Sequence, residues 1–253
     1  MKEYSEYEIK VKSSLDSKIE PSLFFKAEGE EKRPLLVGLH TWSFDRFNQV
    51  NNMLPYAKKH NFHLLLPEFR GANKKDNPRC TEACGSALAV RDIFDAINYV
   101  KENYAVDEGN ILLLGASGGG HMALMTAASD PTLFRAVGSF VPITDLKRWS
   151  EENPNYAENV IACCKSDEEM LKRSPISYAR ELSSANLKIF HGKFDTCVPY
   201  TQSVTLYLEI MKLRRDARVF LDIFDGGHEM RMETAMEWLV SQMTEREDST
   251  VTG

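Results

Sequence analysis

The stretch Ile111–Gly119, which reads ILLLGASGG, decides the fold of this chain. Its first four residues form a continuous apolar run, which is typical of a strand buried on both faces. A G-x-S-x-G pattern follows, and His121–Ala128 then has the character of a helix. The pattern predicts a tight turn that exposes Ser117 at the helix N-terminus, where the helix dipole favours developing negative charge. We therefore predict that Ser117 is a nucleophile, with a glycine-rich phosphate loop or a plain turn as the alternative.

Strands and helices alternate along the chain on both sides of this turn. This rhythm favours an α/β fold, with a mostly parallel central sheet and helices on both faces. Two stretches near the N-terminus, 7–11 and 19–25, add an antiparallel hairpin at one edge. Apolar runs predict further strands at 35–39, 62–66, 111–114, 134–141, 187–190 and 219–224, and helical periodicity predicts helices at 47–57, 88–100, 121–128, 202–213 and 230–242.

One segment interrupts the rhythm. Residues 143–184 are polar and irregular, and a connection of that length in a compact domain is usually functional. We interpret it as a small helical lid inserted into a single domain that spans residues 1–253, and we expect residues 244–253 to form a flexible tail.

Composition excludes several classes of function. The chain has 253 residues, and 31 Lys and Arg against 37 Asp and Glu give a net charge of −6 without a basic run, which argues against nucleic acid as a partner. No apolar stretch approaches the roughly 18 residues that cross a bilayer, and the N-terminus lacks a signal-peptide pattern. We therefore expect a cytoplasmic protein with no membrane partner. The sequence leaves the oligomeric state open.

The cysteines do not follow a metal-binding pattern. Their spacing matches neither paired CxxC motifs nor a Cys/His arrangement, so we predict reduced thiols, no metal and no cofactor. We also predict no catalytic role for Cys197. The five positions are Cys80, Cys84, Cys163, Cys164 and Cys197.

A serine nucleophile needs a base, and the base needs an acid that orients it. Asp195 directly follows the predicted strand 187–190, and His228 directly follows the strand 219–224. The chain order Ser, Asp, His is that of the α/β-hydrolase triad, so we predict Asp195 as the acid and His228 as the base. Asp145 is an alternative acid. We assign structural roles to Asp222, Asp225, His60, His63, His121 and His191.

Acyl transfer also needs two donors for the oxyanion. The N–H of Gly118, the residue after the nucleophile, is the first. The loop after the strand 35–39 should supply the second, for which we favour the N–H of Trp42 over that of Thr41. Aromatic and amide side chains near the predicted site are candidates for substrate contact, with packing or surface exposure as the alternative for each: Trp42, Phe44, Trp149, Asn153, Tyr156 and Tyr200.

Several motifs together resemble the catalytic domain of the prolyl oligopeptidase family, close to the dienelactone hydrolase and acetylxylan esterase branches of the α/β-hydrolase superfamily. They are Pro67–Gly71 (PEFRG), Asp92 with Ala96–Val100 (AINYV), the serine turn, Arg173–Ala179 (RSPISYA), His191–Pro199 (HGKFDTCVP) and Gly227-His228. The resemblance implies the α/β-hydrolase fold, a Ser-His-Asp triad and an acyl-enzyme intermediate.

Two positions depart from that family's pattern. Many members have His-Gly-Gly or His-Gly-Tyr where this chain has His40-Thr41-Trp42, and many have Tyr or Gln where it has Gly118. The second departure predicts open space beside the serine.

The choice of substrate rests on the resemblance and on the chemistry of the leaving group. Oligopeptidases of this family resemble the chain only in their catalytic half and carry a β-propeller, which we do not expect here, with about thirty residues before the first core strand. An amide needs its leaving nitrogen protonated and its chain positioned, whereas an ester demands less. We therefore predict a carboxylic-ester hydrolase acting on small acyl esters. A serine peptidase acting on short peptides is the alternative, followed by a catalytically silent binding protein on the same fold.

Overall fold

The computed structural model describes residues 5–243, in which eight strands form one sheet in the order β1-β2-β4-β3-β5-β6-β7-β8. β1 pairs antiparallel with β2, and β2 pairs antiparallel with β4; the remaining pairs are parallel. The predicted hairpin at the edge of a mostly parallel sheet is confirmed. The strands are β1 Ser5–Lys12, β2 Ile19–Lys26, β3 Arg33–Leu39, β4 His63–Pro67, β5 Val106–Ala116, β6 Ala136–Phe140, β7 Leu187–Gly192 and β8 Val219–Phe224.

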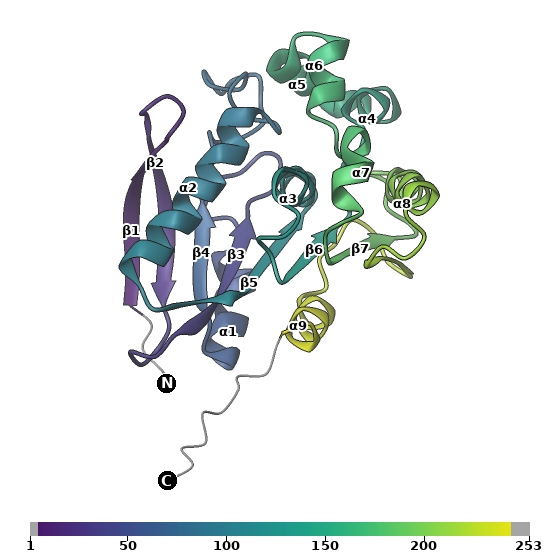
Figure 1. Ribbon diagram of the computed structural model, residues 1–253. Helices are drawn as coiled ribbons and strands as arrows, with labels where there is room; N and C mark the ends of the chain where they lie inside the picture. Colours follow the sequence, from purple (N-terminus) through teal and green to yellow (C-terminus); the bar gives the residue numbers. More distant parts are fainter. Residues whose placement is uncertain (1–4, 244–253) are drawn as a thin grey trace.

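Helices cover both faces of the sheet (Figure 1). The strand period of two explains the two layers, since Ile111 and Leu113 of β5 face one apolar cluster and Leu112 and Leu114 face the other. One face carries α2 (Ala87–Asn103), α3 (Gly118–Ser129) and α8 (Thr201–Leu213), and the opposite face carries α1 (Val50–His60) and α9 (Met232–Ser241).

The start of α1 differs from the prediction. A helix was expected from residue 47, but Phe47 is half exposed and its N–H donates to Asp45 Oδ1 at 3.1 Å. A carboxylate that accepts from the backbone two residues later favours a turn over a helix. The helix therefore begins at Val50.

The segment between β6 and β7 is helical, as predicted. In Figure 1, α4, α5 and α6 gather at the top of the view, away from α1 and α9. That this segment acts as a lid stays a prediction, and the predicted tail at 244–253 lies outside the described residues. Within the described chain, no helix is long and apolar enough to cross a membrane. The lid elements are α4 Leu146–Glu152, α5 Pro154–Cys164, α6 Asp167–Lys172, the 3₁₀ turn η1 Pro175–Tyr178 and α7 Ala179–Leu182.

A strained turn follows β4. Phe69, Arg70 and Gly71 have consecutive φ angles of 38°, 78° and 79°, a region that side chains other than glycine rarely adopt. The ring of Phe69 stacks flat on that of His40, with 3.8 Å between centroids. Farther along this segment, the N–H of Asn73 donates to the Trp42 carbonyl oxygen at 2.8 Å. The segment after β4 therefore supports the loop after β3, which the sequence predicts to supply an oxyanion donor.

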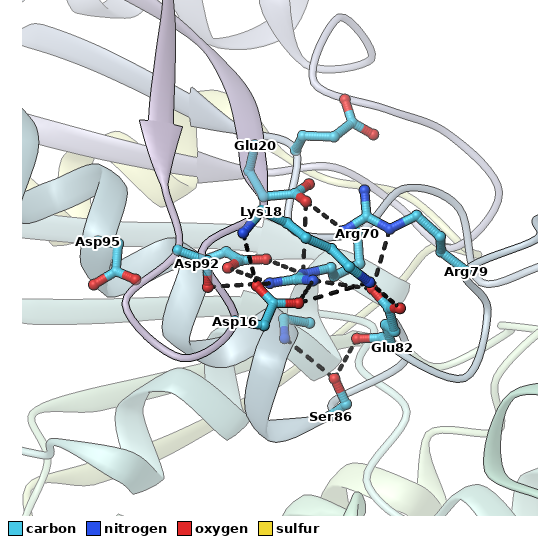
Figure 2. Close-up of polar contacts among 12 residues, drawn as sticks. Asp16, Lys18, Glu20, Arg70, Arg79, Glu82, Ser86, Asp92 and Asp95 are labelled. Carbon is cyan, nitrogen blue, oxygen red and sulfur yellow. Dashed lines mark hydrogen bonds and ion pairs between the residues drawn. The ribbon is translucent and has the colours of Figure 1, made fainter.

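Arg70 holds this turn in place (Figure 2). Its side chain is fully buried and bonds Asp92 of α2, with Nη2 to Oδ1 at 2.9 Å. Its Nη1 bonds Asp16 of the β1–β2 turn at 2.7 Å and Glu82 at 2.9 Å. Burial opposes the charge on this guanidinium, but the hydrogen bonds from the carboxylates outweigh it and raise the pKa of Arg70. One cation thus ties the hairpin, the segment after β4 and α2 together. The sequence indicated Arg70 only as part of the PEFRG motif and did not predict this structural role.

We predict that Arg70→Met lowers the free energy of unfolding by about 3–5 kcal/mol, because the buried carboxylate of Asp92 loses its partner. Urea unfolding followed by circular dichroism measures the change. Lys147→Met is the control, since it breaks an exposed pair with Asp167 and should leave the unfolding midpoint unchanged. Equal midpoints for the two variants would show that Arg70 does not hold the fold.

Candidate active site

Ser117 lies on a strained turn between β5 and α3. Its φ and ψ are 56° and −120°, and its N–H donates to the Phe140 carbonyl oxygen of β6 at 2.9 Å. A Cβ added to Gly115 would lie 2.1 Å from the carbonyl oxygen of Gly119, so the turn requires glycine there. The turn presents the Ser117 side chain at the N-terminus of a helix of 12 residues.

Asp195 and His228 form a hydrogen-bonded pair just after β7 and β8. His228 Nδ1 lies 2.7 Å from Asp195 Oδ2. Asp195 Oδ1 accepts from the N–H groups of Cys197 and Val198 at 2.8 and 2.9 Å. Burial alone would raise the pKa of Asp195, but hydrogen bonds from His191, His228 and the Val198 N–H hold it well below its ordinary value. The carboxylate is therefore an anion placed to orient an imidazole.

The tautomer of His228 follows from this geometry. An ionised carboxylate can only accept, so His228 Nδ1 carries the hydrogen and Nε2 is left as the acceptor of the neutral ring. Ser117 and His228 line the same cavity, which has a volume of about 300 Å³. Within residues 5–243 no hydrogen bond joins the two side chains, and in unliganded sites such bonds are often long.

The alternative carboxylates have structural contacts. Asp145 caps α4 by accepting from the Arg148 N–H at 3.0 Å. Asp222 lies within β8 and pairs with Lys188 at 3.2 Å. These contacts agree with the structural assignment of Asp222 and make Asp145 a helix cap.

Two other histidines are buried and hydrogen-bonded away from the cavity. His121 is fully buried, which lowers its pKa to about 4, and its Nε2 donates to the Arg173 carbonyl oxygen at 2.6 Å. His191 Nε2 lies 2.8 Å from the Val198 carbonyl oxygen, while its Nδ1 lies 2.7 Å from Ser203 Oγ. His191 Nε2 also lies 3.3 Å from Asp195 Oδ2, a contact with the acid that sequence reasoning missed.

The backbone of Trp42 lies against Gly118, so the two residues predicted to bind an oxyanion are neighbours in space. A Cβ added to Gly118 would lie 2.5 Å from both N and Cα of Trp42. The N–H of Thr41, the second choice, donates to Asn48 Oδ1 at 3.1 Å, whereas among residues 5–243 the Trp42 N–H donates to no oxygen. The expectation of open space beside the serine was wrong at this point, because the Trp42 backbone fills the volume that a side chain on Gly118 would need.

Comparison with known proteins now places the chain in a family. The sequence profile of the prolyl oligopeptidase family matches residues 54–245. The chain belongs to the prolyl oligopeptidase family. The resemblance inferred from the sequence is thereby confirmed.

Individual relatives are distant and much longer. The chain is 25% identical over 169 residues to the acylamino-acid-releasing enzyme of Sus scrofa, a match that covers 62% of this chain and 23% of that protein. It is 25% identical over 127 residues to inactive dipeptidyl peptidase 10 of Rattus norvegicus, covering 50% and 16%. The chain therefore spans less than a quarter of the length of these relatives.

A solved structure shows the fold. The acylaminoacyl peptidase of Pyrococcus horikoshii superposes with a TM-score of 0.78 at 19% identity, covering 98% of this chain and 43% of that one. The predicted α/β-hydrolase fold is confirmed.

The structure separates the six predicted substrate-contacting residues into two groups. Trp42, Phe44 and Tyr156 line the cavity with Ser117, whereas Trp149, Asn153 and Tyr200 do not. Trp149 is buried between the lid and Trp42, which favours packing, the alternative given for it, over contact with substrate. Sequence reasoning also missed three amide side chains that line the cavity, and only their position after the strand β3 could have suggested them. Asn48 and Gln49 precede α1, and Asn52 lies in its first turn.

Four cysteines gather where α5 of the lid meets the segment before α2. Cys80, Cys84, Cys163 and Cys164 are buried in one apolar cluster, and all five cysteines are free thiols. Across residues 5–243, no group of three or more His, Cys, Asp or Glu side chains is arranged to hold a metal ion.

We predict that Gly118→Ala lowers stability by about 1–3 kcal/mol, because the added methyl group overlaps the Trp42 backbone. Thermal unfolding measures the effect. Gly227→Ala is the matched control, since a Cβ at Gly227 would meet no atom within 4 Å. If the two variants unfold at the same temperature, the close approach of Trp42 to Gly118 is not present in solution.

Proposed function

We propose that this chain is a serine hydrolase that cleaves short peptides through an acyl-enzyme intermediate on Ser117. The observation that carries the proposal is the 2.7 Å contact between His228 Nδ1 and Asp195 Oδ2, because the same imidazole lines the cavity of Ser117. Membership of the prolyl oligopeptidase family supports it.

The geometry supports a stepwise acyl transfer. Ser117 Oγ attacks the substrate carbonyl carbon, and His228 Nε2 accepts the hydroxyl proton. The buried Asp195 carboxylate stabilises the imidazolium that forms and keeps the ring in one orientation. His228 then donates that proton to the leaving nitrogen as the bond between carbonyl carbon and nitrogen breaks. Water attacks the resulting ester by the same route and restores Ser117.

The oxyanion of each tetrahedral intermediate needs donors already in place. The N–H of Gly118 is the first of α3 and has no intrahelical acceptor. The adjacent N–H of Trp42 supplies the second donor, and the N-terminus of α3 adds a favourable dipole.

The family and its relatives favour a peptide over an ester, which reverses the order of preference drawn from the sequence. Among the matched proteins, one is named as an acylamino-acid-releasing enzyme and another as an acylaminoacyl peptidase. An ester hydrolase is the second candidate, because a cavity of about 300 Å³ suits a small acyl group and an ester needs no protonated nitrogen. The proximity of Asp195 to His228 argues against a silent binding protein.

We predict cleavage of N-acetyl-alanyl-p-nitroanilide, measured as release of nitroaniline. p-Nitrophenyl acetate should acylate Ser117 as well, since p-nitrophenolate is a better leaving group than p-nitroaniline. Turnover of the ester with none of the anilide would restore the ester hydrolase as the better description. Turnover of neither substrate by folded protein would contradict both.

We predict that Asp195→Asn lowers kcat by about 10⁴-fold, because the amide no longer holds His228 in the tautomer whose Nε2 accepts a proton. Steady-state kinetics with p-nitrophenyl acetate measure the loss. Asp222→Asn is the matched control: it neutralises an aspartate paired with Lys188 at the surface and should leave kcat unchanged. Similar kinetics for the two variants would remove Asp195 from the proposed triad.

A further inference from the structure

Two side chains of the lid hold one carbonyl group next to the proposed catalytic acid. Trp149 of α4 donates from Nε1 to the Cys197 carbonyl oxygen at 2.9 Å. Asn153, which follows α4, donates from Nδ2 to the same oxygen at 2.9 Å. Trp149 is 1% exposed, so water does not compete for its N–H. The carbonyl therefore has both of its acceptor positions filled by the lid.

The same residue faces Asp195 with its amide. The Cys197 N–H donates to Asp195 Oδ1 at 2.8 Å, and the N–H of Val198 donates to the same oxygen at 2.9 Å. The Val198 carbonyl oxygen is in turn held by His191 Nε2 at 2.8 Å. Two consecutive residues thus point their N–H groups at the carboxylate while buried donors fix their carbonyl groups. A rotation of the backbone at Cys197 would move the hydrogen bonds that orient Asp195.

The ring of Trp149 packs against Trp42 and Tyr156, two residues that line the cavity. Its centroid lies 4.8 Å from that of Trp42, edge to face at 68°, and 4.8 Å from that of Tyr156. Trp42, Trp149 and Val198 belong to one buried apolar cluster under the lid. Trp149 therefore contacts Trp42, in the loop after β3, through its ring, and Cys197, in the loop of Asp195, through its N–H. It does not line the cavity itself.

We propose that Trp149 is a positioning residue that fixes the Asp195–His228 pair relative to Trp42 and the loop after β3. Asn153 is the second donor to the Cys197 carbonyl. The proposal rests on the proposed serine hydrolase function. It gives the lid a role in maintaining catalytic geometry, separate from any contact of the lid with substrate.

The test removes the N–H and keeps an aromatic ring at the position. Trp149→Phe should lower kcat for p-nitrophenyl acetate about 10-fold, because the Cys197 carbonyl loses one of its two donors and the backbone that orients Asp195 is held less firmly. It should change KM by less than about twofold. Asn153→Asp removes the other donor and keeps the oxygen that caps α5, so it should act in the same direction. Trp238→Phe is the control, because Trp238 lies on α9 and packs against Phe190.

A spectroscopic measurement separates positioning from mere support of the fold. The Nδ1 proton shared by His228 and Asp195 should give a low-field proton resonance that Asp195→Asn abolishes. Trp149→Phe should shift or broaden this resonance, whereas Trp238→Phe should not. A lower melting temperature with wild-type kcat and an unmoved resonance in both lid variants would overturn the proposal. If the wild-type protein turns over no substrate but Trp149→Phe still shifts the resonance, the proposed function is contradicted and the positioning role stands.

Discussion

A buried carboxylate that accepts the Nδ1 hydrogen of His228 is the constraint on which the rest of the site depends. Burial makes the charge costly, so the anion persists because the backbone N–H groups of Cys197 and Val198 and the imidazoles of His191 and His228 all bond to it. Those bonds leave His228 Nε2 as the acceptor toward the cavity of Ser117. The sheet matters to function chiefly because it brings the loops after β5, β7 and β8 to one place.

Two sets of contacts outside the cavity hold these loops in place. Arg70 ties the segment after β4 to the hairpin and to α2, and that segment holds the Trp42 carbonyl through Asn73. The lid holds the Cys197 carbonyl from the other side. The loop that carries Trp42 and the loop that carries Asp195 and Val198 then meet in one apolar cluster, where Trp42 contacts Trp149. Catalytic geometry of this kind needs support that is rigid before substrate arrives.

The fold and the positions of the proposed triad were accessible from sequence because each depends on a local pattern. Ser117 lies in a turn that only glycines permit, and Asp195 and His228 each directly follow an apolar strand. Contacts between distant segments leave no such pattern. Hydrophobicity does not distinguish a Trp149 that faces substrate from one buried against Cys197, and the crowding of Gly118 by Trp42 depends on two loops about seventy-five residues apart. The start of α1 was predicted too early, at residue 47, because the helical spacing of apolar residues does not reveal the turn that Asp45 forms with the Phe47 N–H.

Labelling with a fluorophosphonate probe tests the central claim most directly, because such a probe phosphonylates a serine oxygen far faster when a neighbouring base makes that oxygen nucleophilic. Intact-mass and peptide mass spectrometry should show one adduct per chain, on Ser117, and the adduct should disappear when His228 is replaced by alanine. An unmodified chain after treatment of folded protein, or an adduct that forms equally well without His228, would contradict the account.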